Sequence, residues 1–273
     1  MTLQTYIPPA PLSSYIQMLW YWAGYHPPHP KERILPNGMM EITVNLADEP
    51  FLIYDPQHAF QPQSIYGMMA GGARSDYFVV DTMRPASVLA VWFKPGGALP
   101  FLGVAADEVH NAHLPLELLW GLYARDVYCR LLEARSTIDR FHILEHALLH
   151  RLSQAAARHR AIDYALAMFG RQPQTHKIAE VVNQLALSPA RFIQLFRQDV
   201  GMTPKQFCRV QRFQQALRLI ARQPAPNWVD IALTCGYYDQ AHFINDFQAF
   251  AGITPTAYAP QSREHHTNLA YFD

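Results

Sequence analysis

Cysteine is scarce in this chain of 273 residues: only Cys129, Cys208 and Cys235 are present, and no two of them stand at the spacing of a metal site. An odd number of widely separated cysteines does not build the disulfide framework of a small secreted domain. We therefore expect reduced thiols in a cytoplasmic protein.

Long hydrophobic runs are also lacking. The most apolar stretch, residues 15–25, is too short to cross a bilayer and is interrupted by Gln17 and Gly24. The N-terminus has no basic lead followed by an apolar core, which is the mark of a signal peptide. These absences predict a protein without a membrane partner.

The motifs of several enzyme classes are missing as well. No glycine-rich phosphate loop follows a predicted strand, Gly71-Gly72 being too short for one, and there is no nucleophile elbow. A metal-dependent barrel enzyme typically holds its ion on a His-x-His pair with a later Glu, and the chain has no such pair. We therefore predict that the protein is not an enzyme and has no cofactor.

The histidines leave a metal hypothesis open. His142, His146 and His150 recur at every fourth position of a predicted helix beside Glu145, and histidines on one helix face can hold Zn²⁺ with a third ligand. Ordinary packing or solvation of an amphipathic helix explains them more simply, and we favour it. The other pairs are loop-like and lack a carboxylate pattern: His26-x-x-His29 and His110-x-x-His113.

Net charge is absent overall, with 22 basic and 22 acidic residues, but it is unevenly distributed. Residues 158–273 hold 12 Lys and Arg against 8 Asp and Glu, whereas residues 1–157 hold 10 against 14. An acidic module joined to a mildly basic one gives weak support to a nucleic-acid partner for the second half.

The first 113 residues are rich in proline, aromatic and β-branched residues. Residues 40–46, 51–54 and 87–93 are short runs typical of strands, with turn signals at 36–38 and 95–97. This pattern predicts a small, cupin-like β-barrel. The aromatic residues Trp20, Tyr21, Trp22, Tyr25, Tyr66 and Trp92 fill its core or line an effector pocket, and we favour the core.

From residue 114 the apolar period changes to that of helices. Segments 116–132, 138–160 and 162–169 are amphipathic, and residues 170–173 end the last of them. We therefore predict an effector-binding and dimerisation domain at 1–170 (barrel 1–113, helices 114–169), a helical domain at 171–260 and a tail at 261–273.

The helical domain contains one unit twice. Residues 185–197 are echoed by 234–248, and the tails at 200–204 and 251–255 share the pattern Gly-x-Thr-Pro. Ser188 and Asp239 are helix caps that stand four positions before the first buried phenylalanine of each copy. A long helix from Pro204 to about Ala221 joins the copies. Two such units fit two successive turns of a DNA groove.

A helix-turn-helix lays its second helix in the major groove, where Gln and Asn pair with adenine, Arg pairs with guanine, and Ala or Ile touches thymine methyls. A solvated polar face would look the same in a single unit, but the duplication favours DNA binding. The residues predicted to contact DNA are Ala190, Arg191, Gln194, Arg197 and Gln198 in the first copy, Lys205, Arg209 and Arg212 on the joining helix, and Gln240, Ala241, Ile244, Asn245 and Gln248 in the second.

Residues 175–260 resemble the DNA-binding domain of AraC/XylS-type transcriptional regulators. The resemblance is carried by residues 231–243, followed by Phe247, Gly252, Thr254-Pro255 and Tyr258. Residues 33–38, 93–97 and 115–121 resemble an uncharacterised sensor-type domain found ahead of such modules. The resemblance implies an α+β protein with an all-α double helix-turn-helix, promoter DNA as partner, a small-molecule effector, a homodimer formed by the helices of 114–169, and RNA polymerase as a further partner.

The chain departs from the family pattern at four positions. Gln194 and Asn245 stand where relatives usually carry Arg, Gln248 stands where they carry a basic residue, and Ala186 replaces a turn glycine. The second copy should therefore hold DNA less through charge. We assign most electrostatic affinity to these residues: Arg191, Arg197, Lys205, Arg209 and Arg212.

The sequence thus predicts a DNA-binding regulator controlled by an unknown effector. One alternative is a small-molecule-binding or metal-dependent barrel enzyme with a structural helical tail. Another is a DNA-binding module whose N-terminal half is purely architectural.

Overall fold

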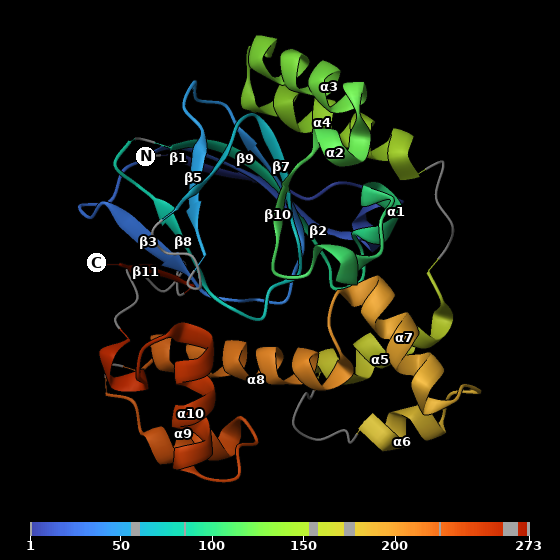
Figure 1. Ribbon diagram of the computed structural model, residues 1–273, viewed down its shortest axis with the longest axis vertical. Helices are drawn as coiled ribbons and strands as arrows, with labels where there is room; N and C mark the ends of the chain where they lie inside the picture. Colours follow the sequence, from blue (N-terminus) through green and yellow to red (C-terminus); the bar gives the residue numbers. More distant parts are fainter. Residues whose placement is uncertain are drawn as a thin grey trace.

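Two β-sheets, the helices packed on one of them, and an all-helical body make up the structure (Figure 1). The computed structural model describes residues 2–55, 61–84, 86–152, 158–171, 178–223, 225–258 and 267–271. The expected linker at 170–173 is wrong in its first half, because Gly170 and Arg171 are the last residues of the helix α5 (Arg160–Arg171). Its other half, residues 172–173, and most of the tail at 261–273 lie outside these ranges. None of the described helices is both long enough and apolar enough to span a membrane.

The larger sheet has six strands, all antiparallel to their neighbours, in the order β1-β2-β9-β4-β7-β10. Its strands are β1 (Thr2–Tyr6), β2 (Ile16–Tyr25), β4 (Glu41–Asn45), β7 (Met68–Gly71), β9 (Ala86–Phe93) and β10 (His113–Pro115). The strands expected at 40–46 and 87–93 are β4 and β9.

The second sheet has five strands, in the order β11-β3-β8-β5-β6. Its strands are β3 (Lys31–Ile34), β5 (Phe51–Tyr54), β6 (Gln63–Ile65), β8 (Phe78–Asp81) and β11 (Asn268–Ala270). The last of these comes from the C-terminal tail and pairs antiparallel with β3, so the end of the chain returns to the N-terminal half.

The α+β class is confirmed, but the closed, cupin-like barrel is wrong. Among the described strands no hydrogen-bonded ladder joins one sheet to the other, so the two remain separate open sheets. Period-2 alternation cannot distinguish these arrangements, because a closed barrel and two open sheets both present one apolar inner face.

The faces of the larger sheet divide the core from the cavity described below. On its outer face, buried aliphatic residues of three strands belong to one hydrophobic cluster with residues of α3 (Leu122–Glu133) and α4 (Thr137–Leu152). The strand members include Leu19, Ile42 and Leu89. One expected helix over 116–132 is in fact two, α2 (Glu117–Trp120) and α3, because Gly121 has a positive φ of 60°. α1 (Leu99–Leu102) and the 3₁₀ helix η2 (Ala106–Val109) precede β10.

The C-terminal half is built around one long helix, α8 (Pro204–Ala221), which carries five shorter neighbours (Figure 1). These are α5 (Arg160–Arg171), α6 (Ile178–Asn183), α7 (Pro189–Val200), α9 (Trp228–Thr234) and α10 (Gln240–Ala251). The expected inward phenylalanines of both copies, Phe192, Phe196, Phe243 and Phe247, are fully buried.

The two halves pack directly against each other. The turn at 36–38 lies on α8, where the buried Gln214 donates from Nε2 to the carbonyl oxygen of Pro36 at 2.8 Å. At the far end, Arg33 of β3 donates from Nη1 to the carbonyl oxygen of Ala251, the last residue of α10, at 2.8 Å. A cation placed at a helix C-terminus also opposes the helix dipole favourably.

Gly72 stands where the backbone of another segment passes too closely for any side chain. A Cβ added there would lie 1.6 Å from the carbonyl oxygen of Val109. We therefore expect Gly72→Ala to lower the free energy of unfolding by roughly 3 kcal/mol, because the 109–112 segment must move. Urea denaturation of the full chain measures the effect.

Gly170→Ala is the matched control. Gly170 lies in α5 with a negative φ and has nothing within 4 Å of an added Cβ, so the same change should be neutral or stabilising by up to about 1 kcal/mol. Equal destabilisation by the two variants would contradict the close approach at Gly72.

Candidate nucleic-acid interface and cavity

The two repeated units are α6–α7 and α9–α10, and each second helix is capped as the sequence predicts. Ser188 accepts a hydrogen bond from the Arg191 backbone N–H, and Asp239 accepts one from that of His242. Both helices end on a left-handed glycine, Gly201 and Gly252. The second helix of each copy therefore begins at a side-chain cap and ends at a left-handed glycine, at corresponding positions of the two copies.

Most residues predicted to contact DNA lie on open helix faces. In α7, Ala190, Arg191, Gln194 and Arg197 are exposed and Gln198 is half-buried. In α10 and α8 the pattern continues, with exposed Ala241, Asn245, Gln248 and Lys205 and half-buried Gln240, Ile244, Arg209 and Arg212.

Two of the arginines assigned to electrostatic affinity hold the second copy onto α8. Arg209 donates from Nη2 to Oδ1 of Asp246 at 2.7 Å, and the Asp246 side chain is 8% exposed. Arg212 donates from Nη1 to the carbonyl oxygen of Gly236 at 3.2 Å, and its guanidinium lies over the Tyr237 ring. Asp246 is thus a buried partner of Arg209 rather than part of the outward face, a pairing that helical spacing within α10 cannot reveal.

Arg197 contacts the N-terminal half. Its Nη2 lies 3.4 Å from Oδ2 of Asp107, in η2, with the two side chains 52% and 24% exposed. η2 packs against the end of α7, since a Cβ added at Gly201 would meet the Ala106 carbonyl oxygen at 3.0 Å. One candidate DNA-contacting side chain is therefore shared with the sheet-bearing half.

The turn of the first copy is made without a left-handed residue at Ala186. Gly236, in the second copy, has a φ of 73°, whereas Asn111 is the only described residue other than glycine with a positive φ. The substitution of the usual glycine by Ala186 is therefore accommodated by a different backbone path in the first turn.

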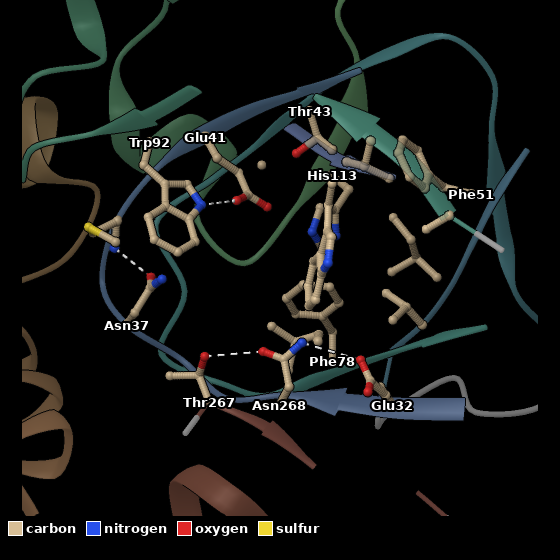
Figure 2. A pocket seen from close by; sticks show the side chains of 18 of the residues that line it. Glu32, Asn37, Glu41, Thr43, Phe51, Phe78, Trp92, His113, Thr267 and Asn268 are labelled. Atoms are coloured by element: carbon tan, nitrogen blue, oxygen red, sulfur yellow. Dashed lines mark hydrogen bonds between the residues drawn. The ribbon is translucent and has the colours of Figure 1, made fainter. Parts of the chain in front are cut away.

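A cavity of about 580 Å³ lies between the two sheets (Figure 2). Trp20, Trp22, Tyr25 and Trp92 line it, so these aromatics do not simply fill a core as we favoured from sequence. Tyr66, by contrast, is 68% exposed. Alternation places a side chain on the inner face but does not say whether the opposing sheet comes close enough to touch it.

Polar groups of the cavity share one row across the larger sheet. The strand registers align Met18, Trp92, Glu41, Gly71 and His113 on neighbouring strands, all on the cavity side. Trp92 Nε1 donates to Oε2 of Glu41 at 3.0 Å (Figure 2). A Cβ at Gly71 would lie 3.0 Å from Cγ of Glu41 and 3.5 Å from Cδ2 of His113, so the glycine lets both side chains lie over it.

Burial controls the charge of both titratable groups in this row. It raises the pKa of Glu41, opposed by the hydrogen bond from Trp92 and the charge of Arg74. It lowers the pKa of His113 to about 3, with Arg74 adding to the shift. His113 is therefore neutral, and its Nε2 has no hydrogen-bonding partner among the described residues.

The histidines raised as metal ligands have other surroundings. His142 packs edge-on against Tyr6, His150 packs against Tyr123, and His29 lies 3.1 Å from Glu32. His110 lies 3.3 Å from the Ser75 hydroxyl. Within the described residues, no group of three or more His, Cys, Asp or Glu side chains is arranged to hold a metal ion.

Two family models match the chain. Residues 181–261 match one described as a helix-turn-helix domain, and residues 4–115 match one described as a domain of unknown function (DUF6597). They cover the two stretches whose motifs resemble known families.

Among curated proteins, an uncharacterized HTH-type transcriptional regulator of Haemophilus influenzae is 32% identical over 133 residues, covering 47% of this chain and 44% of that protein. The HTH-type transcriptional regulator GadX of Escherichia coli is 30% identical over 91 residues, covering 33% and 32%. The matched segments span less than half the length of these relatives.

Among solved structures, ToxT of Vibrio cholerae in a crystal form described as unsaturated fatty acid bound is similar, with a TM-score of 0.51 at 10% identity. The match covers 88% of this chain and 94% of that one. At this identity the similarity concerns the fold, in which a sheet-rich half precedes a helical one.

Asp199 lies on the inner side of α7, where burial of its carboxyl group should make stability depend on pH. It is 6% exposed, its Oδ2 has no partner among the described residues, and burial raises its pKa to about 6, against the usual 3.8. Between these values the folded chain keeps a proton that the unfolded chain has released, so stability falls as pH rises from about 4 to 6 and stays lower above. Asp199→Asn should therefore raise the free energy of unfolding at pH 7.5 by about 2 kcal/mol.

The measurement is the difference in unfolding free energy between wild type and Asp199→Asn at pH 4.5, 6 and 7.5. Arg158, His159 and Asp163, the other charged groups acting on Asp199, are present in both proteins, so their titration largely cancels. A difference that does not grow with pH would show that Asp199 is not destabilised by its burial.

Proposed function

We propose that this protein is a transcription regulator of the AraC type that binds promoter DNA under the control of a small molecule. The observation that carries the proposal is the pair of capped helices α7 and α10, held by one linker helix with their polar faces open. The curated relatives matched by this half are HTH-type transcriptional regulators.

The groups on the two faces suit different readings of DNA. Gln194, Gln240 and Asn245 carry amides that pair with adenine, while Arg191 provides a guanidinium for guanine or phosphate. Arg209 and Arg212 are engaged in holding the second copy onto α8. We therefore propose that the electrostatic affinity for DNA comes from three other residues: Arg191, Arg197 and Lys205.

Control by a small molecule is supported by the position of the cavity. Pro36 and Asn37 line the cavity with one side of their turn. On the other side of the turn, their carbonyl oxygens accept hydrogen bonds from the side chains of Gln214 and Gln211 of α8, respectively. Thr267 and Asn268, which follow α10 in the chain, line the cavity as well. An occupant that shifts these segments changes how α8 presents the two units, which is a ligand-biased equilibrium between states. ToxT, the structural neighbour, has been crystallised with an unsaturated fatty acid.

Dimerisation through the helices of 114–169 remains part of the proposal. Large apolar side chains are exposed along α2, α3 and the start of α4, where a second copy can cover them. They are Leu118 (71%), Leu122 (80%), Leu132 (48%) and Ile138 (49%). We also propose domain limits at 170 and 260. The resemblance to AraC/XylS-type regulators further implies RNA polymerase as a partner and a cytoplasmic location, and both are part of the proposal.

The competing class is a metal-dependent enzyme with a structural helical tail. Metal analysis of the purified protein and a promoter-fragment shift at low salt separate the two. Stoichiometric metal without DNA affinity would overturn the regulator.

The asymmetry of charge between the copies gives a direct test. Arg197→Ala should weaken binding to a promoter fragment about tenfold and lower the slope of log affinity against log salt by about one, since one phosphate contact is lost. Gln248→Ala, in the second copy, should leave the salt slope unchanged. Fluorescence anisotropy across a salt series measures both; equal losses in slope would contradict an anchoring first copy.

The pair between Asp107 and Arg197 gives a second test. If docking on η2 competes with DNA for Arg197, Asp107→Asn should strengthen promoter binding by roughly threefold, the scale of a surface ion pair. The matched control is Glu108→Gln, which removes the same charge from the exposed neighbouring position. A gain of the same size in both variants would mean that only the net charge matters.

A further inference from the structure

We propose that the cavity between the sheets binds an organic cation, an amine or quaternary ammonium group carried on an apolar body. The inference rests on the proposed regulatory function only in naming this molecule as the effector. The binding site itself is argued from the walls of the cavity.

Aromatic rings form one end of the cavity and meet edge to face. The ring centroids of Trp20 and Trp92 lie 5.7 Å apart at 71°, and those of Trp20 and Trp22 lie 6.3 Å apart at 81°. Rings at steep angles to one another surround a volume with several π faces. Such a box attracts a cation and excludes an anion, because the face of each ring is electronegative.

Glu41 provides the carboxyl group beside this box, and a bound cation would favour its charged form. Its carboxyl is deep in the protein, yet the residue keeps accessible surface because it lines the cavity. One oxygen accepts from Trp92, so the charge is held against an aromatic wall. Burial raises the pKa of Glu41, which means that the empty cavity disfavours the carboxylate and that a bound cation would stabilise it.

Arg74 also lines the cavity, but its charge is balanced on the other side. Its principal charge partners are Asp55 and Asp76, ahead of Glu41. Nη1 donates to the carbonyl oxygen of Asn111 at 2.7 Å, and the guanidinium lies over the ring of Phe78. A carboxylate ligand would have to compete with these partners.

The remaining cavity walls provide further carboxyl groups and an apolar surface. Two other carboxyls among the described residues line the cavity, and both have partners. Glu32 accepts from Tyr25 and from Asn268 (the latter bond is drawn in Figure 2) and lies 3.1 Å from His29. Asp81 accepts from the backbone N–H of Met83. Glu41 is the one that lies against Trp92. An apolar wall for the body of the ligand comes from Phe51, Ile53, Met69, Phe78 and Val80. The buried, neutral His113 lies in the same row as Glu41 and adds no charge to that wall.

The test compares three probes of equal chain length on the full-length protein: decyltrimethylammonium, decanoate and decan-1-ol. The two ionic probes are kept below their micellar concentrations and the alcohol below its solubility limit. Calorimetry and tryptophan fluorescence report binding. We expect the cation to bind about tenfold more tightly than decanoate, on the scale of a desolvated cation–π and ion-pair contact. Tighter binding of decanoate, or no binding of any probe, would overturn the proposal.

Variants locate the interaction. Glu41→Gln should weaken the cation about tenfold or more while leaving decan-1-ol within about threefold, and Trp20→Leu should weaken the cation in the same direction. The control is Glu117→Gln, an exposed carboxyl paired with Arg125. Unchanged cation affinity in folded Glu41→Gln would contradict the site. Should that variant not fold, as thermal denaturation would reveal, the wild-type ranking of probes and Trp20→Leu still decide.

A promoter-binding measurement with and without the cation separates this inference from the regulatory one. A cation that binds the cavity without altering DNA affinity sustains the ligand class and refutes its role as effector. A protein that binds promoter DNA but prefers decanoate sustains the regulator and refutes the cation site.

Discussion

The turn at residues 36–38 is the point on which the arrangement of the two halves depends. Its inner side is part of the cavity, and its outer side is fixed to α8 by the buried hydrogen bond from Gln214 to Pro36. A side-chain amide buried at such a junction is costly unless it is paired, so the bond sets one register between the halves. Val210 of α8 packs within 3.4 Å of the position of a Cβ on Gly38, which keeps the contact close.

Much of the helical half could be predicted from sequence because its signals are local. Caps at Ser188 and Asp239, the left-handed Gly236 and the buried phenylalanines each follow from spacing within a few residues. The strands β4 and β9 follow in the same way from short runs rich in β-branched and aromatic residues. These features do not depend on what the segments pack against.

The remaining features are set by contacts between distant residues, which local patterns do not encode. Arg209 is predicted from sequence to contact DNA, yet it pairs with Asp246, 37 positions along the chain. Trp20 and Trp92 have the composition of a core, and only the separation of the two sheets makes them the walls of a cavity. The tail gave no sign of a strand, because three residues paired with β3 are too short for a periodic signal.

The return of the chain to β3 has a mechanical consequence. The helical half is attached to the sheets at both ends, through α5 on entry and β11 on exit. A body held at two points can rock or swing about the line between them, but it cannot tumble freely as a module on a single linker does. Peeling β11 from the sheet edge would release one of these attachments, so the strength of one short strand pair limits how far the helices can travel.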